Sequence, residues 1–355
     1  AGDFSRQNDM WKYNIAANQW TWVRDYPIIG FPGVYGTQGI ASLANKPGSR
    51  TNPMTSSVSG QVLLLFGGSG VGRALAGALN DVWEFNTLTS EWTYLKGDSD
   101  VNVPGVYGSV GIYAATNNPG GRESGASWKD DDGNLWIFGG FGYDESGSSG
   151  YLNDLWKYDY VFNQWKWEKG DKIINQYGVY GIQGTGAAGN KPGARRGAAT
   201  WLDPSGNLWM FGGYGYDEAG SVGYLNDLWC YNTFFKHWIW IKGDKTINNV
   251  GSYGQIGVSS EFNKPGSRNE ATTWVNAFGL WLYGGEGYSE FNATGYLNDL
   301  WKFDFTTNQW VWMKGSSSIN QLAVYGTMGV QSVTNDPGGR SATAKWTDIY
   351  GGFWM

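Results

Sequence analysis

The 355-residue sequence has one cysteine, one histidine, no long apolar run and no cluster of basic residues. Cys230 cannot form a disulfide within the chain, and His237 alone leaves too few ligands for a transition-metal site. No apolar run approaches the ~18 residues that a membrane helix requires. The formal net charge of -6 removes the attraction on which binding to nucleic acid largely depends. We therefore expect no cofactor, no metal, no nucleic-acid partner and no membrane insertion.

Glycine and aromatic residues are abundant instead. The chain has 56 glycines, 22 tryptophans, 22 tyrosines and 16 phenylalanines. This composition fits short strands that are joined by tight turns and anchored by large rings, and it does not fit long helices. Low lysine content with many glycines and aromatics is similar to that of secreted microbial proteins, and Ala1-Gly2-Asp3 could follow a removed signal peptide. We expect an extracellular protein.

The motif Asn-Asp-x-Trp recurs five times at intervals of 72 or 73 residues. Its tryptophans are Trp11, Trp83, Trp156, Trp229 and Trp301. Nine residues after each comes a further tryptophan that opens an alternating segment typical of a strand, at Trp20, Trp92, Trp165, Trp238 and Trp310. Upstream of the motif lies an apolar run that ends in a double glycine, and before that run lies a segment that begins with arginine. A fixed period of this length indicates a repeat architecture.

Each repeat therefore supplies four strands in a constant order. The arginine segment comes first, the double-glycine run second, the Asn-Asp-x-Trp segment third and the terminal tryptophan segment fourth. Four short antiparallel strands per repeat predict an all-β fold, a β-propeller in which each repeat forms one blade.

This pattern of a double glycine followed by spaced aromatic residues on two strands resembles the Kelch repeat. The resemblance spans essentially the whole chain, but the repeat is longer than the roughly 50 residues of a Kelch unit. The extra length is an insertion between blades that carries a Tyr-Gly pair and an Asn-Pro-Gly-Arg cluster in each copy. The resemblance implies a propeller that acts through interactions.

We predict five blades in a single propeller domain over residues 1–355. Half-blades at residues 1–30 and 340–355 would combine into one blade, and the other blades cover about 50–97, 122–170, 195–243 and 268–315. Pairing the two halves would remove exposed sheet edges. If the chain is part of a longer protein, six or more blades are the alternative.

One tyrosine of each insertion is a candidate for an interaction face, because tyrosine gives a large contact area with a polar tip. The candidates are Tyr35, Tyr107, Tyr180, Tyr253 and Tyr325. A residue that recurs in every copy also suits a strut that packs its own loop against the neighbouring blade. Both interpretations stay open at this point.

The repeated charges favour a structural role over a functional one. A buried guanidinium group can join loop carbonyls to a carboxylate once in each repeat. The residues are Arg50, Arg122, Arg195, Arg268, Arg340, Asp9, Asp81, Asp154, Asp227 and Asp299.

Three remaining features are weighed as sites. The pairs Asp144-Glu145 and Asp217-Glu218 lack the spacing of calcium ligands, so we expect solvated loop charges. The sequence Asn292-Ala293-Thr294 is a possible N-glycosylation site. Glu286 is the main unrepeated carboxylate near a double glycine, and a glycoside hydrolase needs two.

We therefore predict a protein that is not an enzyme and has no catalytic residues. The leading hypothesis is an interaction or structural scaffold whose loop face binds a protein partner or copies of itself, with assembly into an extracellular polymer as a sharper version. The alternative is a carbohydrate-binding propeller, since exposed rings stack on sugars. A glycoside hydrolase is less favoured.

Overall fold

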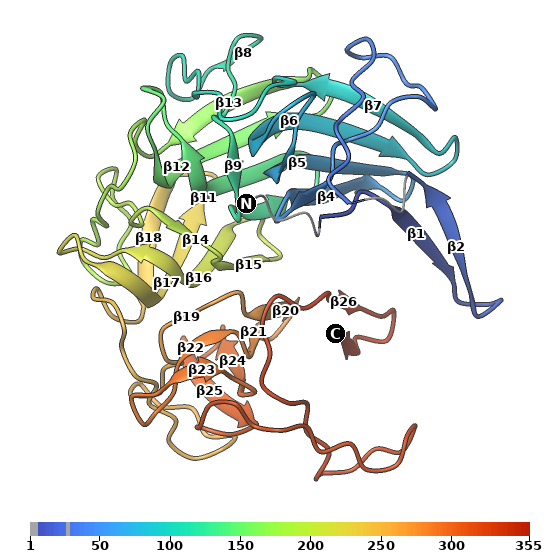
Figure 1. Cartoon of the computed structure of the whole chain (residues 1–355). Helices are drawn as coiled ribbons and strands as arrows, with labels where there is room; N and C mark the ends of the chain where they lie inside the picture. The colour runs from blue at the N-terminus through green and yellow to red at the C-terminus, as the bar shows by residue number, and fades with distance from the viewer. Residues whose placement is uncertain (1–5, 26–28) are drawn as a thin grey trace. The chain divides into compact units, whose positions relative to one another are not determined.

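The computed structural model of the chain describes residues 6–25 and 29–355 (Figure 1). The chain divides into two compact units, Ala1–Ile174 and Asn175–Met355. Within the described residues all regular secondary structure is β, and every strand pair is antiparallel. The predicted all-β fold class is confirmed.

Unit 1 contains a hairpin and two larger sheets. The hairpin is β1 (Met10–Asn14) and β2 (Gln19–Arg24). The first repeat is β3 (Arg50–Thr51), β4 (Met54–Ser59), β5 (Val62–Val71), β6 (Ala76–Asn86) and β7 (Glu91–Lys96). The second repeat is β9 (Arg122–Glu123), β10 (Ala126–Lys129), β11 (Leu135–Tyr143), β12 (Ser149–Asp159) and β13 (Gln164–Lys169), with β8 (Tyr113–Ala114) added beside β13.

Unit 2 repeats this plan. The third repeat is β14 (Arg195–Arg196), β15 (Ala199–Leu202), β16 (Leu208–Tyr216), β17 (Val222–Asn232) and β18 (His237–Lys242). The fourth repeat is β19 (Arg268–Asn269), β20 (Thr272–Asn276), β21 (Gly279–Tyr283), β22 (Glu286–Tyr288), β23 (Thr294–Tyr296), β24 (Leu300–Asp304) and β25 (Gln309–Lys314). A short pair, β26 (Trp346–Thr347) and β27 (Phe353–Trp354), follows.

The arginine segment forms two short strands where one was expected. In the first repeat β3 and β4 both pair with β5, and Asn52 lies between them at a φ of 52°. The left-handed region breaks an extended strand, because it turns the chain away from the pleat. The same break occurs at Ser124, Gly197 and Glu270 in the next three repeats.

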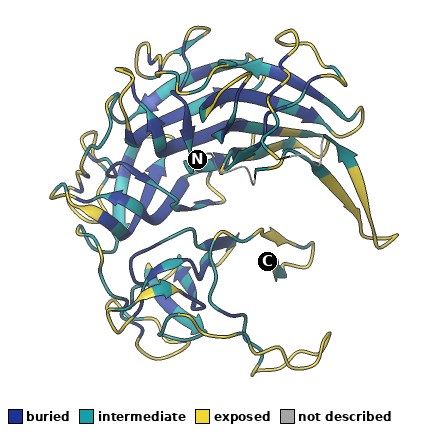
Figure 2. Cartoon of the chain, in the orientation of Figure 1, coloured by how far each residue is buried: buried dark blue, intermediate teal, exposed yellow. Residues whose placement is uncertain are grey.

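Neighbouring repeats within a unit pack face to face, and their contact faces are buried (Figure 2). In unit 1, Leu64 and Phe66 belong to one buried cluster with Leu135 and Ile137, and the ring of Phe66 lies 5.0 Å from that of Trp165. In unit 2, Phe211 and Trp310 make the equivalent contact at 5.4 Å. The terminal tryptophans of the second and fourth repeats thus pack against the preceding repeat.

The hairpin β1–β2 corresponds to the third and fourth strands of a repeat, and the pair β26–β27 corresponds to the first and second. Residues 1–5 and 26–28 of the predicted half-blade 1–30 lie outside the described residues. Four sheets have the order expected of propeller blades. The number of five blades stays a prediction.

Candidate functional site

A buried charged pair lies in each of the four complete repeats. In the third repeat, Arg195 donates from Nη1 to Oδ1 of Asp227 at 2.5 Å and from Nη2 to Oδ2 at 2.8 Å. Tyr180 and Trp229 both donate to Oδ2, from Oη at 2.6 Å and from Nε1 at 2.7 Å. All four side chains are buried. We call this set and its counterparts the arginine–aspartate cluster.

The strand geometry explains how the cluster forms. Trp229 follows Asp227 by two residues on β17, and its indole donates back to the Asp227 carboxylate. Two further donors of Arg195 go to backbone carbonyls, from Nε to Gly193 at 2.9 Å and from Nη1 to Gly212 at 3.0 Å. The guanidinium group therefore ties the insertion to the double glycine and to the third strand.

Burial and the ion pair shift the pKa values of the cluster. Burial lowers the pKa of Arg195, but the charge of Asp227 and its hydrogen bonds outweigh this, so the pKa lies above its ordinary value. Burial, followed by the charge of Asp227, raises the pKa of Tyr180 well above its ordinary value. Both groups therefore keep their protons in the folded protein, and neither is poised for acid-base chemistry.

The same geometry recurs in the other three complete repeats. The clusters are Arg50, Asp81, Tyr35 and Trp83, then Arg122, Asp154, Tyr107 and Trp156, then Arg268, Asp299, Tyr253 and Trp301. The fifth set is divided between the units. Asp9 accepts a hydrogen bond from the Trp11 indole at 2.6 Å in unit 1, and Arg340 donates to the Gly338 carbonyl at 2.9 Å in unit 2.

The structure decides between the two interpretations of the insertion tyrosines. Tyr35, Tyr107, Tyr180 and Tyr253 are buried and donate to an aspartate, so they are struts. The strut interpretation therefore describes these four tyrosines, and the interaction-face interpretation does not. Tyr325 differs, because 81% of its surface is exposed.

The insertions are ordered against the outermost strand of each complete repeat. Asn190 donates from Nδ2 to the carbonyl of Trp238 at 3.2 Å and to that of Thr185 at 3.0 Å. Ala187 forms an isolated β-bridge with the same tryptophan. The asparagine bond recurs at Asn45, Asn117 and Asn263. The insertion therefore covers an edge that would otherwise offer free backbone groups to another chain.

The two residues of each acidic loop pair differ in burial. Asp144 is buried, and it accepts hydrogen bonds from the backbone amides of Ser146, Ser148 and Ile174 at 2.9 to 3.1 Å. Asp217 accepts the equivalent set. Both aspartates therefore organise their loops, which corrects the expectation of solvated charges at these positions. The adjacent glutamates, Glu145 and Glu218, are exposed and form ion pairs with Lys172 and Lys245.

A row of three residues crosses each complete repeat next to the cluster, and its residue types vary. In the third repeat Tyr214 pairs with Arg196 on one side and Tyr224 on the other. The rows are Thr51, Ser69 and Ala78; Glu123, Phe141 and Tyr151; Arg196, Tyr214 and Tyr224; Asn269, Glu286 and Tyr296. We call each a variable row. All these residues are at least partly exposed. Among them, only Glu286 stood out from the sequence pattern.

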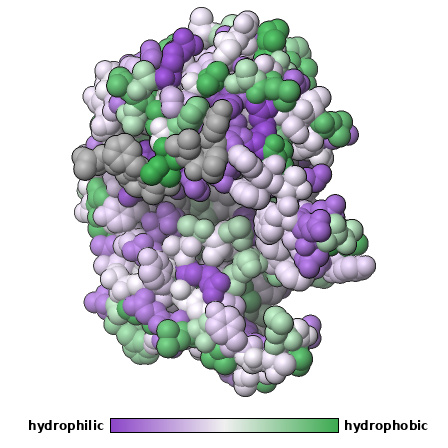
Figure 3. Space-filling view, turned by 45° about the vertical axis from the view of Figure 1, so that its right-hand side comes forward, coloured by the Kyte–Doolittle hydropathy of each residue, from purple (hydrophilic) through white to green (hydrophobic). Residues whose placement is uncertain are grey.

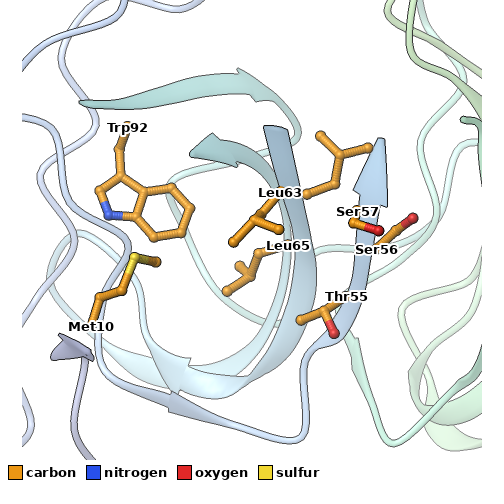
Figure 4. Close-up of a pocket in the computed structure, with 8 residues that line it drawn as sticks. Met10, Thr55, Ser56, Ser57, Leu63, Leu65 and Trp92 are labelled. Atoms are coloured by element: carbon orange, nitrogen blue, oxygen red, sulfur yellow. The ribbon is translucent and has the colours of Figure 1, made fainter. Parts of the chain in front are cut away.

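Unit 1 also contains an apolar cavity of about 440 Å³ (Figure 4). Met10 and Trp92 face Leu63 and Leu65 across it, and Thr55 to Ser57 complete its wall. In the second repeat the residues equivalent to these leucines are fully buried against Leu64 and Phe66 of the repeat before. The cavity is therefore lined by strand positions whose equivalents in the second repeat pack against the repeat before.

Three other expectations concern metal binding, membrane insertion and glycosylation. Within the described residues, no group of three or more His, Cys, Asp or Glu side chains could hold a metal ion. Across residues 6–25 and 29–355, no helix is long and apolar enough to span a membrane. Asn292 lies in the exposed loop between β22 and β23, and its glycosylation stays a prediction.

Arg195→Ala is expected to lower the free energy of unfolding by about 3–5 kcal/mol, because it leaves the Asp227 charge buried and unpaired. Urea unfolding followed by tryptophan fluorescence measures this loss. The control is Lys129→Ala on exposed β10 surface, which should change stability by less than about 0.5 kcal/mol. Equal stability of both variants would refute the structural role of the cluster.

Stability is expected to fall above pH ~10, the ordinary pKa of tyrosine. The raised pKa of Tyr180 means that the unfolded chain loses this proton first, so its contribution is intact below pH ~10 and decreases as pH rises. Each such tyrosine adds a slope of about 1.4 kcal/mol per pH unit. Unfolding measured at several alkaline pH values should show a shallower slope in Tyr180→Phe and an unchanged one in Tyr325→Phe. Identical slopes in all three proteins would contradict the prediction.

Comparison with known proteins agrees with this geometry. The family model described as Kelch motif matches residues 50–99, which hold the first repeat, β3 to β7. No curated protein matches the chain significantly. The strand order and the arginine–aspartate cluster of the matched repeat recur in the other three complete repeats. Residues 50–99 therefore carry a Kelch motif, which agrees with a Kelch-repeat propeller.

Proposed function

We propose that this protein is a non-catalytic scaffold that binds a protein partner through its variable rows. The observation that supports the proposal is the contrast between two layers of each repeat. The arginine–aspartate cluster has the same four residue types in every complete repeat, whereas the adjacent row has a different set in each. A constant frame that carries variable, partly exposed side chains suits recognition of a partner.

The residue types of the rows support a protein partner. Tyrosine, phenylalanine and arginine are enriched at the centres of protein interfaces, and they fill most of the second and third rows. Phe141 and Tyr151 contact each other with ring centroids 5.3 Å apart, and Tyr214 and Tyr224 do so at 5.1 Å. Such paired rings have few conformations to lose when a partner binds.

The first repeat provides the design of a test. Its row has Ser69 and Ala78 at the positions of Phe141 and Tyr151, so the frame accepts small residues there. The double variant Phe141→Ser, Tyr151→Ala is expected to keep its stability within about 1.5 kcal/mol, because it removes one partly exposed ring pair. It should lose partner binding. Affinity capture with wild-type and variant chains, quantified by mass spectrometry, measures the loss.

The matched control is Leu88→Ser, which removes an exposed apolar side chain from the turn between β6 and β7. It should retain every protein that the wild-type chain captures specifically. Capture of the same proteins at the same level by the double variant would show that the rows are not the binding surface.

A second candidate function is self-association, and the exposure of the hairpin β1–β2 favours it. Trp11 and Trp20 are 52% and 66% exposed, whereas their equivalents in the first repeat, Trp83 and Trp92, are 0% and 5% exposed. The face in Figure 3 shows apolar residues at many separate places among polar ones. The hairpin rings and the cavity beside Met10 give unit 1 apolar surface suited to another copy's strands.

Trp20→Ser is expected to weaken self-association by about tenfold or more, since burial of one large ring contributes 1.5–3 kcal/mol or so. Sedimentation velocity over a range of protein concentrations measures the association constant. Leu88→Ser again serves as the control, because it removes exposed apolar surface elsewhere. A wild-type chain that stays monomeric at every concentration, or a Trp20 variant that associates normally, would exclude this candidate.

A further inference from the structure

The variable row of the fourth repeat differs from the others in carrying a carboxylate at its centre. Glu286 on β22 pairs with Asn269 on β19 and with Tyr296 on β23 (Figure 1). Tyr288 follows it by two residues on the same strand, so both side chains lie on one face. The ring of Tyr288 lies 6.1 Å from that of Tyr224 in the third repeat. Two neighbouring repeats of unit 2 thus contribute to one surface.

Hydrogen-bond acceptors are concentrated on this surface. Burial, followed by the charge of Glu286, raises the pKa of the Tyr224 phenol to about 12, and the charges of Tyr214 and Glu270 add to the shift. The phenol therefore stays neutral, and Glu286 keeps further lone pairs for a ligand.

The acceptors lack matching donors within the chain. Across the part of the chain that the structure describes, neither Glu270 nor Glu286 forms an ion pair. The Oδ1 atom of Asn269 is buried and has no hydrogen-bond partner there. Arg196 is the cation of the adjacent row, and it has interactions of its own. The two glutamates and this arginine together leave one negative charge.

We propose that this surface binds a guanidinium side chain of a protein partner. The proposal rests on the proposed interaction function and names the chemistry of one contact. A guanidinium group has five donors and accepts none, which complements two carboxylates. Its flat face also interacts favourably with tyrosine rings such as those of Tyr224 and Tyr288. A neutral sugar would satisfy the acceptors without using the charge.

The test is a titration of the full chain with the peptide acetyl-Gly-Arg-Gly-amide, followed by calorimetry or by NMR. The same peptide with citrulline in place of arginine has the shape of the side chain without its charge. We expect saturable binding of the arginine peptide that is weakened about tenfold or more with citrulline and in Glu286→Gln, since a hydrogen bond to a charged group contributes at least 1.5 kcal/mol or so.

One variant controls the experiment. Glu290→Gln removes an exposed carboxylate from the following loop and should bind the arginine peptide as the wild-type chain does. Melting curves of all variants show whether each is folded, and a Glu286→Gln chain that melts like wild type isolates the binding effect.

Three results would overturn the proposal. They are the absence of saturable arginine-peptide binding to the wild-type chain, equal binding of the citrulline peptide, and unchanged binding in Glu286→Gln. Binding of a methyl glycoside panel in place of the arginine peptide would show a saccharide site. None of these outcomes affects the result expected for the double variant Phe141→Ser, Tyr151→Ala. Failure of the guanidinium site and failure of the interaction function are therefore distinguishable.

Discussion

The fold of each repeat depends on the burial of one arginine with one aspartate. Removing both charges from water costs several kcal/mol per ion, so the pair is tolerated only when every donor and lone pair is satisfied. In the third repeat, Arg195 reaches two carbonyls in addition to Asp227, and Tyr180 and Trp229 complete the carboxylate. The tyrosine of the insertion and the tryptophan of the third strand are therefore fixed by the charge that they solvate.

This requirement connects segments that are far apart in the sequence. Tyr180 comes from the insertion before the repeat, Arg195 from its first strand and Asp227 from its third. A repeat cannot form the cluster without its insertion, which explains why the longer-than-usual unit keeps its length in each copy. The insertion in turn covers the edge of β18 through Asn190, so one network orders both the inside and the rim of the sheet.

The sequence was sufficient to predict the strands and the structural role of the charges, because both recur with the repeat. Recurrence left two interpretations of Tyr107 and its counterparts, since a repeated residue suits a strut as well as a contact, and the buried hydrogen bond to Asp154 agrees with the strut. The buried role of Asp144 was missed, because a loop carboxylate that binds its own backbone amides has the same sequence signature as a solvated one. The variable rows were missed because their residues differ from repeat to repeat, and recurrence marks only the positions that stay the same.

A signal for the rows was nevertheless present in the pattern Gly-Gly-x-Gly. In the third repeat, a side chain on Gly212 would lie 2.6 Å from the carbonyl oxygen of Arg268, and one on Gly215 would lie 2.1 Å from that of Ala194. Gly213 has a φ of 100°, which other residues rarely adopt. Tyr214, between Gly213 and Gly215, is therefore the one position of this stretch that can change its side chain without displacing backbone. The close packing of the glycines leaves this position as the one where the side chain can vary. The same packing also fixes the position of that side chain beside the arginine–aspartate cluster.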